Sequence, residues 1–163
     1  MKKVIMLVLI GVLLTGCGNK DATSKNGTLS ADGYEFVSAG TTITMNKEAK
    51  EIIAKLGTYK DYYETASCAF DGLDKQYFYE GFQVDTYPMD GVDYISMVYI
   101  EKENIPTKEG VKVGDTADKV KETYGTEYKE DMGSYIYTSG KSQLKFYLES
   151  NVVSAIEYIA ITK

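Results

Sequence analysis

The stretch Leu144-Lys145-Phe146-Tyr147-Leu148-Glu149, followed by Ser150-Asn151, decides the fold class. Three apolar side chains alternate with polar or amphipathic ones, which is the pattern of a strand with one face in the core and the other in water. Serine and asparagine favour turns, so a further antiparallel strand is expected after this pair. Residues 82–87 show the same alternation. We therefore predict antiparallel strands in both halves of the chain.

Two amphipathic helices are expected ahead of these strands. The first is predicted over residues 47–56, with Asn46 as its N-cap and Gly57 where a left-handed residue commonly ends a helix. Its apolar residues recur with the helical period. The second helix repeats this pattern at one constant spacing along the chain, with Asp115 or Thr116 as its cap and Gly125 after its last turn.

These patterns predict an α+β fold made of two tandem units, about 34–105 and 106–163. Each unit is expected to be a helix plus a three-strand antiparallel meander, with the helices packed on one sheet face. A strand is expected to enter each helix, over residues 34–44 and 110–113. The first unit carries extra residues around 67–75, which are the largest difference between the two units.

The first seventeen residues predict export and lipid anchoring. Lys2 and Lys3 precede an apolar run over residues 4–14, which is too short for a good permanent membrane span. Leu14-Thr15-Gly16-Cys17 fits a lipobox. We expect a signal peptide at 1–16, a lipidated Cys17 with a flexible tether over 17–33, and one globular domain over 34–163, held on the extracytoplasmic face of the cell membrane. The alternative is an ordinary secretory signal with an incidental cysteine.

Composition excludes several classes of function. The formal net charge is −6, and all 18 basic residues are lysines, so a clustered basic face for nucleic acid is not expected. The absence of histidine removes the commonest general base and the usual serine or cysteine triads. One cysteine beside the lipidated one cannot build a zinc site, and Cys68 is expected to be a small, buried and inert thiol. We expect no cofactor and no metal.

Two resemblances extend this interpretation. The run Ser67-Cys68-Ala69-Phe70-Asp71-Gly72-Leu73-Asp74-Lys75, continuing through Tyr77 to Pro88, resembles uncharacterised lipoproteins of clostridia-like Gram-positive bacteria. The tandem helix-plus-meander plan after a lipobox is similar to the β-lactamase-inhibitor-protein-like repeats and to the small lipoproteins of outer-membrane assembly. These resemblances imply a location and a fold, and they imply no activity.

Tyrosine is the residue type that points to binding. The chain has 15 tyrosines and no tryptophan, and tyrosine is enriched at binding surfaces because it offers a large contact area at low entropic cost. Strands also favour aromatic residues, so many of these rings are expected in the core. Tyr87 and Tyr147 fall on the polar phase of their strands.

The expected site is the loop around residues 67–75 with the adjoining sheet face, because loops on rigid scaffolds often carry function. The candidate partner-binding residues are Asp71, Asp74, Lys75 and Tyr87. We expect a non-enzymatic, lipid-anchored binding protein for a protein, peptide or glycan of the envelope or wall. The alternatives are a structural or assembly component of an envelope complex and, third, a glycan-acting hydrolase that uses a pair of carboxylates.

Replacing Cys17 tests the predicted anchor. The Cys17→Ala variant has no thiol to carry the lipid, so we expect an unprocessed precursor or release of the protein into the medium. Metabolic labelling with a fatty-acid probe measures the lipid directly. Label that persists in the variant would contradict lipidation at this residue.

Overall fold

The structure is a computed structural model of the 163-residue chain, and it describes residues 32–162. The predicted signal peptide, Cys17 and all of the predicted tether except its last two residues lie outside this range. The predicted α+β class is confirmed, with two helices and two antiparallel sheets. The elements are β1 (Glu35–Ser38), β2 (Thr41–Thr44), α1 (Ala49–Leu56), β3 (Asp61–Ala66), β4 (Leu73–Phe78), β5 (Phe82–Met89), β6 (Val92–Ile100), α2 (Ala117–Tyr124), β7 (Lys129–Asp131), β8 (Ser134–Ser139), β9 (Ser142–Glu149) and β10 (Val152–Ala160).

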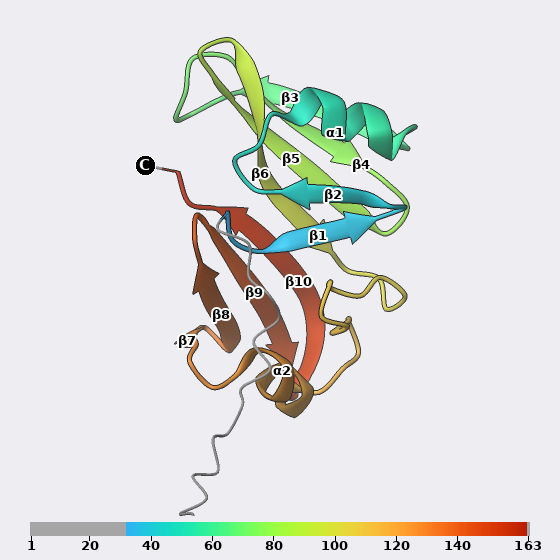
Figure 1. Cartoon of the computed structure of the whole chain (residues 1–163), viewed down its shortest axis with the longest axis vertical. Coiled ribbons are helices and arrows are strands. Elements are labelled where there is room, and N and C mark those ends of the chain that lie inside the picture. The colour runs from blue at the N-terminus through green and yellow to red at the C-terminus, as the bar shows by residue number, and fades with distance from the viewer. Residues whose placement is uncertain (1–31, 163) are drawn as a thin grey trace, which may run out of the picture.

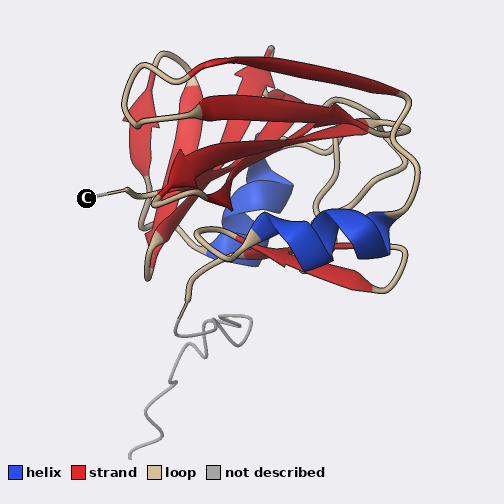
Figure 2. Cartoon of the chain, turned by 90° about the horizontal axis from the view of Figure 1, so that it is seen from above, coloured by secondary structure: helices blue, strands red, loops and turns tan. Residues whose placement is uncertain are grey.

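The larger sheet has eight strands in the order β3-β4-β5-β6-β10-β9-β8-β7 (Figure 1). Each half of the chain contributes a meander of four strands, and the two meanders join where β6 pairs with β10. The hairpin β1–β2 forms a separate two-strand sheet. Both helices and this hairpin lie on the same face of the large sheet, as Figures 1 and 2 show. Within residues 32–162, no helix or hairpin covers the opposite face of the large sheet.

The predicted division into two three-strand units is not seen. Each helix is followed by four strands, and all eight belong to one continuous sheet. The strand expected at residues 34–44 is the hairpin β1–β2, whereas residues 110–113 form no strand. The pattern within a single segment does not predict the β6–β10 pairing, because that pairing joins residues far apart in the chain.

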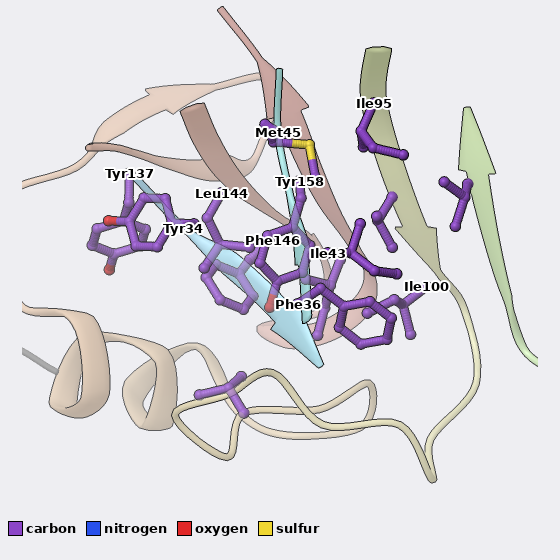
Figure 3. Packing of buried hydrophobic residues seen from close by; sticks show 14 of the residues in the cluster. Tyr34, Phe36, Ile43, Met45, Ile95, Ile100, Tyr137, Leu144, Phe146 and Tyr158 are labelled. Atoms are coloured by element: carbon purple, nitrogen blue, oxygen red, sulfur yellow. The ribbon is translucent and has the colours of Figure 1, made fainter. Parts of the chain in front are cut away.

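The core lies between the large sheet and the layer that carries the hairpin and the helices (Figure 3). Leu144 and Phe146 have no exposed surface, so the alternation predicted for β9 is confirmed at these two positions. The hairpin contributes Phe36 and Ile43, which are also fully buried. Phe36 packs against Tyr158 of β10, with ring centroids 5.7 Å apart, and this contact fixes the hairpin on the centre of the sheet.

The two helices end alike and begin differently. Gly57 and Gly125 follow the last turns with φ of 80° and 90°, a left-handed region in which glycine carries no steric penalty. Thr116 caps α2 because its hydroxyl accepts a hydrogen bond from the Lys119 backbone N–H at 3.2 Å. The predicted cap Asn46 is wrong, because α1 begins later and Glu48 precedes it without a side-chain cap bond.

Asn46 instead connects distant parts of the chain. It has φ 63°, a conformation that asparagine tolerates better than most residues. Its side-chain amide donates to the carbonyl oxygens of Lys141 and Ile161, at 3.1 and 3.4 Å.

Within residues 32–162, no helix combines the length and the apolar character that a membrane crossing requires.

The difference between the two helix starts is testable. Thr116→Ala removes the hydroxyl that satisfies an end donor of α2, so we expect a loss of about 1 kcal/mol in the free energy of unfolding. Glu48→Ala, at the equivalent position of α1, should change that energy far less because no cap bond is lost. Urea unfolding followed by circular dichroism measures both, and equal losses would contradict the assigned cap.

Candidate functional site

A groove of about 500 Å³ lies on the open face of the large sheet. It runs across β3 to β6, with the β3–β4 loop at one side and the end of β10 at the other. Its five large apolar side chains are those of Tyr63, Phe70, Tyr87, Met97 and Ile159. Its polar lining includes the carboxylates of Asp74 and Asp85.

Strand register builds the floor of this groove. The pairings place Tyr63 beside Gln76, Gln76 beside Asp85, Asp85 beside Met97, and Met97 beside Ile159. One residue from each of five neighbouring strands therefore lies in a single row. The next row in the opposite phase contains Val84, Val98 and Tyr158, which have no exposed surface and face the core. The floor row thus belongs to the open face, since side chains alternate across a sheet.

Asp85 is the polar centre of the row. Its two carboxylate oxygens accept hydrogen bonds from the amide nitrogens of Gln83, at 2.7 Å, and Gln76, at 3.2 Å. Burial raises the pKa of this carboxyl above its ordinary value, and the nearby charges of Glu157 and Asp74 add to that rise. The two glutamine donors act in the opposite direction because they stabilise the charged form.

Three of the four residues predicted from the sequence line this groove. Asp74, Lys75 and Tyr87 are among its lining residues, whereas Asp71 is exposed in the β3–β4 loop and is not. The Lys75 ammonium lies 2.6 Å from a carboxylate oxygen of Asp93, and this hydrogen bond raises the pKa of Lys75. Lys75 therefore brings little uncompensated positive charge to the groove.

Tyr87 is buried, although it falls on the polar phase of its strand. Its side chain points to the open face as its strand phase predicts, yet only 8% of it is accessible. The ring of Phe70 covers it at a centroid distance of 4.8 Å, and Tyr94 flanks it at 5.7 Å. Its hydroxyl donates to Asn46 Oδ1 at 3.0 Å. Tyr87 thus forms a fixed end wall of the groove.

The expectation that Cys68 is buried is wrong, because this thiol is exposed. The Ser67 hydroxyl accepts hydrogen bonds from the backbone N–H groups of Ala69 and Phe70, at 3.4 and 3.3 Å. This turn directs the Phe70 ring onto Tyr87 and leaves Cys68 toward solvent. The apolar anchor of the loop is therefore Phe70.

The extra residues predicted for the first half lengthen the hairpin that borders the groove. β3 has six residues where β7 has three, and residues 67–72 connect β3 to β4 where Met132 and Gly133 connect β7 to β8. The groove therefore lies beside the longer hairpin, and the end of β10 is the part of the second half that reaches it.

A second polar cluster continues the open face beyond the groove. The Tyr147 hydroxyl donates to Glu157 at 2.6 Å, and the Lys145 ammonium lies 4.3 Å from the centre of the Tyr147 ring.

Among residues 32–162, no group of three or more metal-ligating acids or cysteines comes together. The arrangement suits recognition by contact, with apolar walls around a few fixed polar atoms.

Comparison with known proteins shows similarity of fold only. No family model matches the sequence, and no curated protein matches it. The structure is similar to that of an extracellular protein containing an SCP domain from Bacillus anthracis str. Ames, with a TM-score of 0.55 and 9% identity over 71% of this chain and 44% of that one. It is also similar to a cysteine-rich secretory protein from Staphylococcus aureus subsp. aureus Mu50, with a TM-score of 0.51 and 12% identity over 71% and 43% of the two chains.

These structures correct the expected resemblance. The fold is similar to parts of SCP-domain and cysteine-rich secretory proteins, and not to the β-lactamase-inhibitor-protein-like repeats or the small outer-membrane-assembly lipoproteins. The chain spans less than half the length of each of the two proteins. The likeness therefore does not by itself assign an SCP domain to this chain.

Neutralising Asp85 tests its burial. A raised pKa means that the folded state holds the proton more tightly than the unfolded state, so this carboxyl lowers stability as pH rises from its ordinary pKa through its folded pKa. Asp85→Asn removes that penalty. We expect the melting temperature of Asp85→Asn minus that of the unaltered protein to be larger at pH 7 than at pH 4.

Asp71→Asn is the matched control, because it removes an exposed carboxylate of the neighbouring loop. Thermal melting followed by circular dichroism at both pH values measures the two variants. The same pH dependence in both would show that Asp85 carries no special desolvation penalty.

Proposed function

We propose that this chain is a non-enzymatic binding protein held by lipid on the extracytoplasmic face of the cell membrane. The groove on the open sheet face is the site where it takes up a protein, peptide or glycan of the envelope or wall. The observation that carries this proposal is the row of five cross-strand neighbours, in which hydrogen bonds from Gln76 and Gln83 fix the half-buried Asp85 beside Met97.

The dimensions and lining of the groove support binding. Ligand pockets commonly enclose about 300–1,000 Å³ and combine apolar walls with a few fixed polar groups. The groove has about 500 Å³, with Phe70 and Met97 among its walls and Asp85 among its polar atoms. Rigid strands carry most of these residues, so their positions do not depend on ligand.

The location rests on the lipobox at Leu14 to Cys17. The two similar structures are described as an extracellular protein and a secretory protein, which agrees with export of this chain. The membrane would then be one partner, through the lipid on Cys17, and the ligand of the groove would be a second.

The alternative function is a structural or assembly component of an envelope complex. The observation that favours it is the extent of the uncovered sheet face, which continues from the groove to Tyr99 and Tyr147, whose ring centroids are 6.4 Å apart. A permanent neighbour could cover this whole face, whereas a transient ligand would need only the groove.

We also infer that the two halves are a degenerate tandem repeat, although they share one sheet. The helices α1 and α2 both have eight residues. The third strands of the two meanders, β5 and β9, have eight residues each, and the last strands, β6 and β10, have nine. The groove would then be a specialisation of the first copy.

Site-specific photo-crosslinking in living cells tests the binding proposal. A benzophenone amino acid replaces Tyr63, which lines the groove and is 64% exposed, or Met132, which is fully exposed in the β7–β8 turn and is not among the residues that line the groove. Irradiation should give a discrete adduct of higher mass from position 63 and none from position 132. Adducts of equal yield from both positions, or from neither, would contradict a binding site in the groove.

A further inference from the structure

The two edges of the large sheet are protected very differently. β7 has three residues, Lys129, Glu130 and Asp131, so it is short and fully charged, as edges that avoid further pairing often are. β3 has six residues, including two tyrosines, and contains neither lysine nor proline. Within residues 32–162, β3 pairs with β4 alone. β3 is thus the edge that remains open to another strand.

The backbone of β3 offers hydrogen-bonding groups on that open side. The Ser67 N–H donates to the Gly72 carbonyl at 3.0 Å, and N–H groups alternate in direction along an antiparallel strand. The N–H groups of Tyr62, Glu64 and Ala66 therefore point away from β4. The Tyr62 N–H donates to the Asp61 carboxylate at 2.8 Å. Those of Glu64 and Ala66 have no partner in the described part of the chain.

The open edge is continuous with the groove. Tyr63 and Thr65 of β3 both line the groove, and Tyr63 is the first residue of its floor row. A strand added beside β3 would place every second side chain on the open face, next to Tyr63 and Thr65. Main-chain pairing and side-chain recognition would then occur on one continuous surface.

The charge of this surface is negative. Asp61, Asp74 and Asp85 share the strand phase of Tyr63, so all three carboxylates lie on the open face. The lysines nearby are already paired, since Lys60 contacts Glu80 and Lys75 contacts Asp93. A cationic segment would be attracted here, whereas a second copy of this chain would bring the same acidic edge to it.

We propose that β3 accepts an extended, lysine- or arginine-containing segment of another polypeptide as a ninth strand of the large sheet. Backbone bonds to Glu64 and Ala66 hold the segment, and its cationic side chains on the open face lie against Asp61 and Asp74. The proposal rests on the proposed binding function, and it names a protein as the ligand class and the strand edge as the means of capture.

Synthetic peptides test this directly with the detergent-solubilised full chain. The probe is a fluorescent eight-residue peptide of alternating lysine and threonine, and anisotropy measures its affinity. The same peptide with glutamate in place of lysine should bind about tenfold more weakly, because attraction becomes repulsion. A version of the lysine peptide that is N-methylated at alternate residues keeps the charge and loses the backbone N–H donors. Its affinity should also fall about tenfold, which corresponds to the loss of one or two hydrogen bonds.

Two variants locate the interaction on β3. Ala66→Pro removes one outward N–H without touching the ladder to β4, and Asp74→Asn removes one groove carboxylate. Each variant should bind the lysine peptide with severalfold lower affinity than the unaltered protein does. Asp71→Asn, which removes an exposed carboxylate outside the groove, should leave its affinity unchanged. Circular dichroism confirms folding of each variant, and Asp74→Asn keeps the test decisive if Ala66→Pro fails to fold.

Several results would overturn the proposal. Equal binding of the N-methylated and unmethylated peptides would exclude strand addition, and equal binding of the glutamate peptide would exclude charge recognition. No binding of the lysine peptide, with binding of a chitosan oligosaccharide or dimerisation of the chain instead, would replace the ligand by a cationic glycan or a second copy. If photo-crosslinks from position 63 persist while all peptides fail, the binding function stands and strand addition is wrong.

Discussion

The antiparallel pairing of β6 with β10 is the constraint on which the rest of the structure depends. It is the one place where the two meanders touch as neighbouring strands, and it turns two four-strand sheets into one. The pairing sets both faces at once. Val98 faces Tyr158 on the core side, and Met97 faces Ile159 on the open side. A shift of one residue would exchange these two rows and move the core residues into water.

The core layer protects that register. Phe36 of the hairpin β1–β2 packs against Tyr158 at 5.7 Å and against Phe82 at 5.2 Å, so one ring contacts strands from both halves. Aromatic pairs of this kind contribute about 0.5–1.5 kcal/mol each beyond the area that they bury. The Tyr34 N–H donates to the Ser142 hydroxyl at 2.8 Å, which fixes the start of the hairpin to β9. The hairpin is therefore the element that holds the two halves in one arrangement.

Local sequence patterns predicted the structural features that depend only on neighbouring residues. The alternation around Phe146, the cap at Thr116 and the glycines after both helices all follow from the nearest residues, and the structure confirms them. The continuous sheet and the floor row through Asp85 depend on which strands become neighbours, so no single segment contains them. The sequence pattern did not predict the exposure of Cys68 or the burial of Tyr87 for the same reason. The turn at Ser67 places the Phe70 ring on Tyr87, which belongs to another strand, and leaves Cys68 exposed.

The groove and the open edge of β3 lie next to each other, and both depend on the longer β3–β4 hairpin. The longer β3–β4 hairpin extends the sheet on this side, and within residues 32–162 no further strand pairs with the outer edge of β3. The same extension supplied the loop whose Phe70 closes one end of the groove. In the second half the hairpin stays short, and its edge strand β7 is entirely charged. An exposed edge is a hazard that folded proteins normally suppress, as this chain does at β7. The open edge at β3, beside a groove with one fixed carboxylate, is therefore the feature on which the proposed capture of another polypeptide rests.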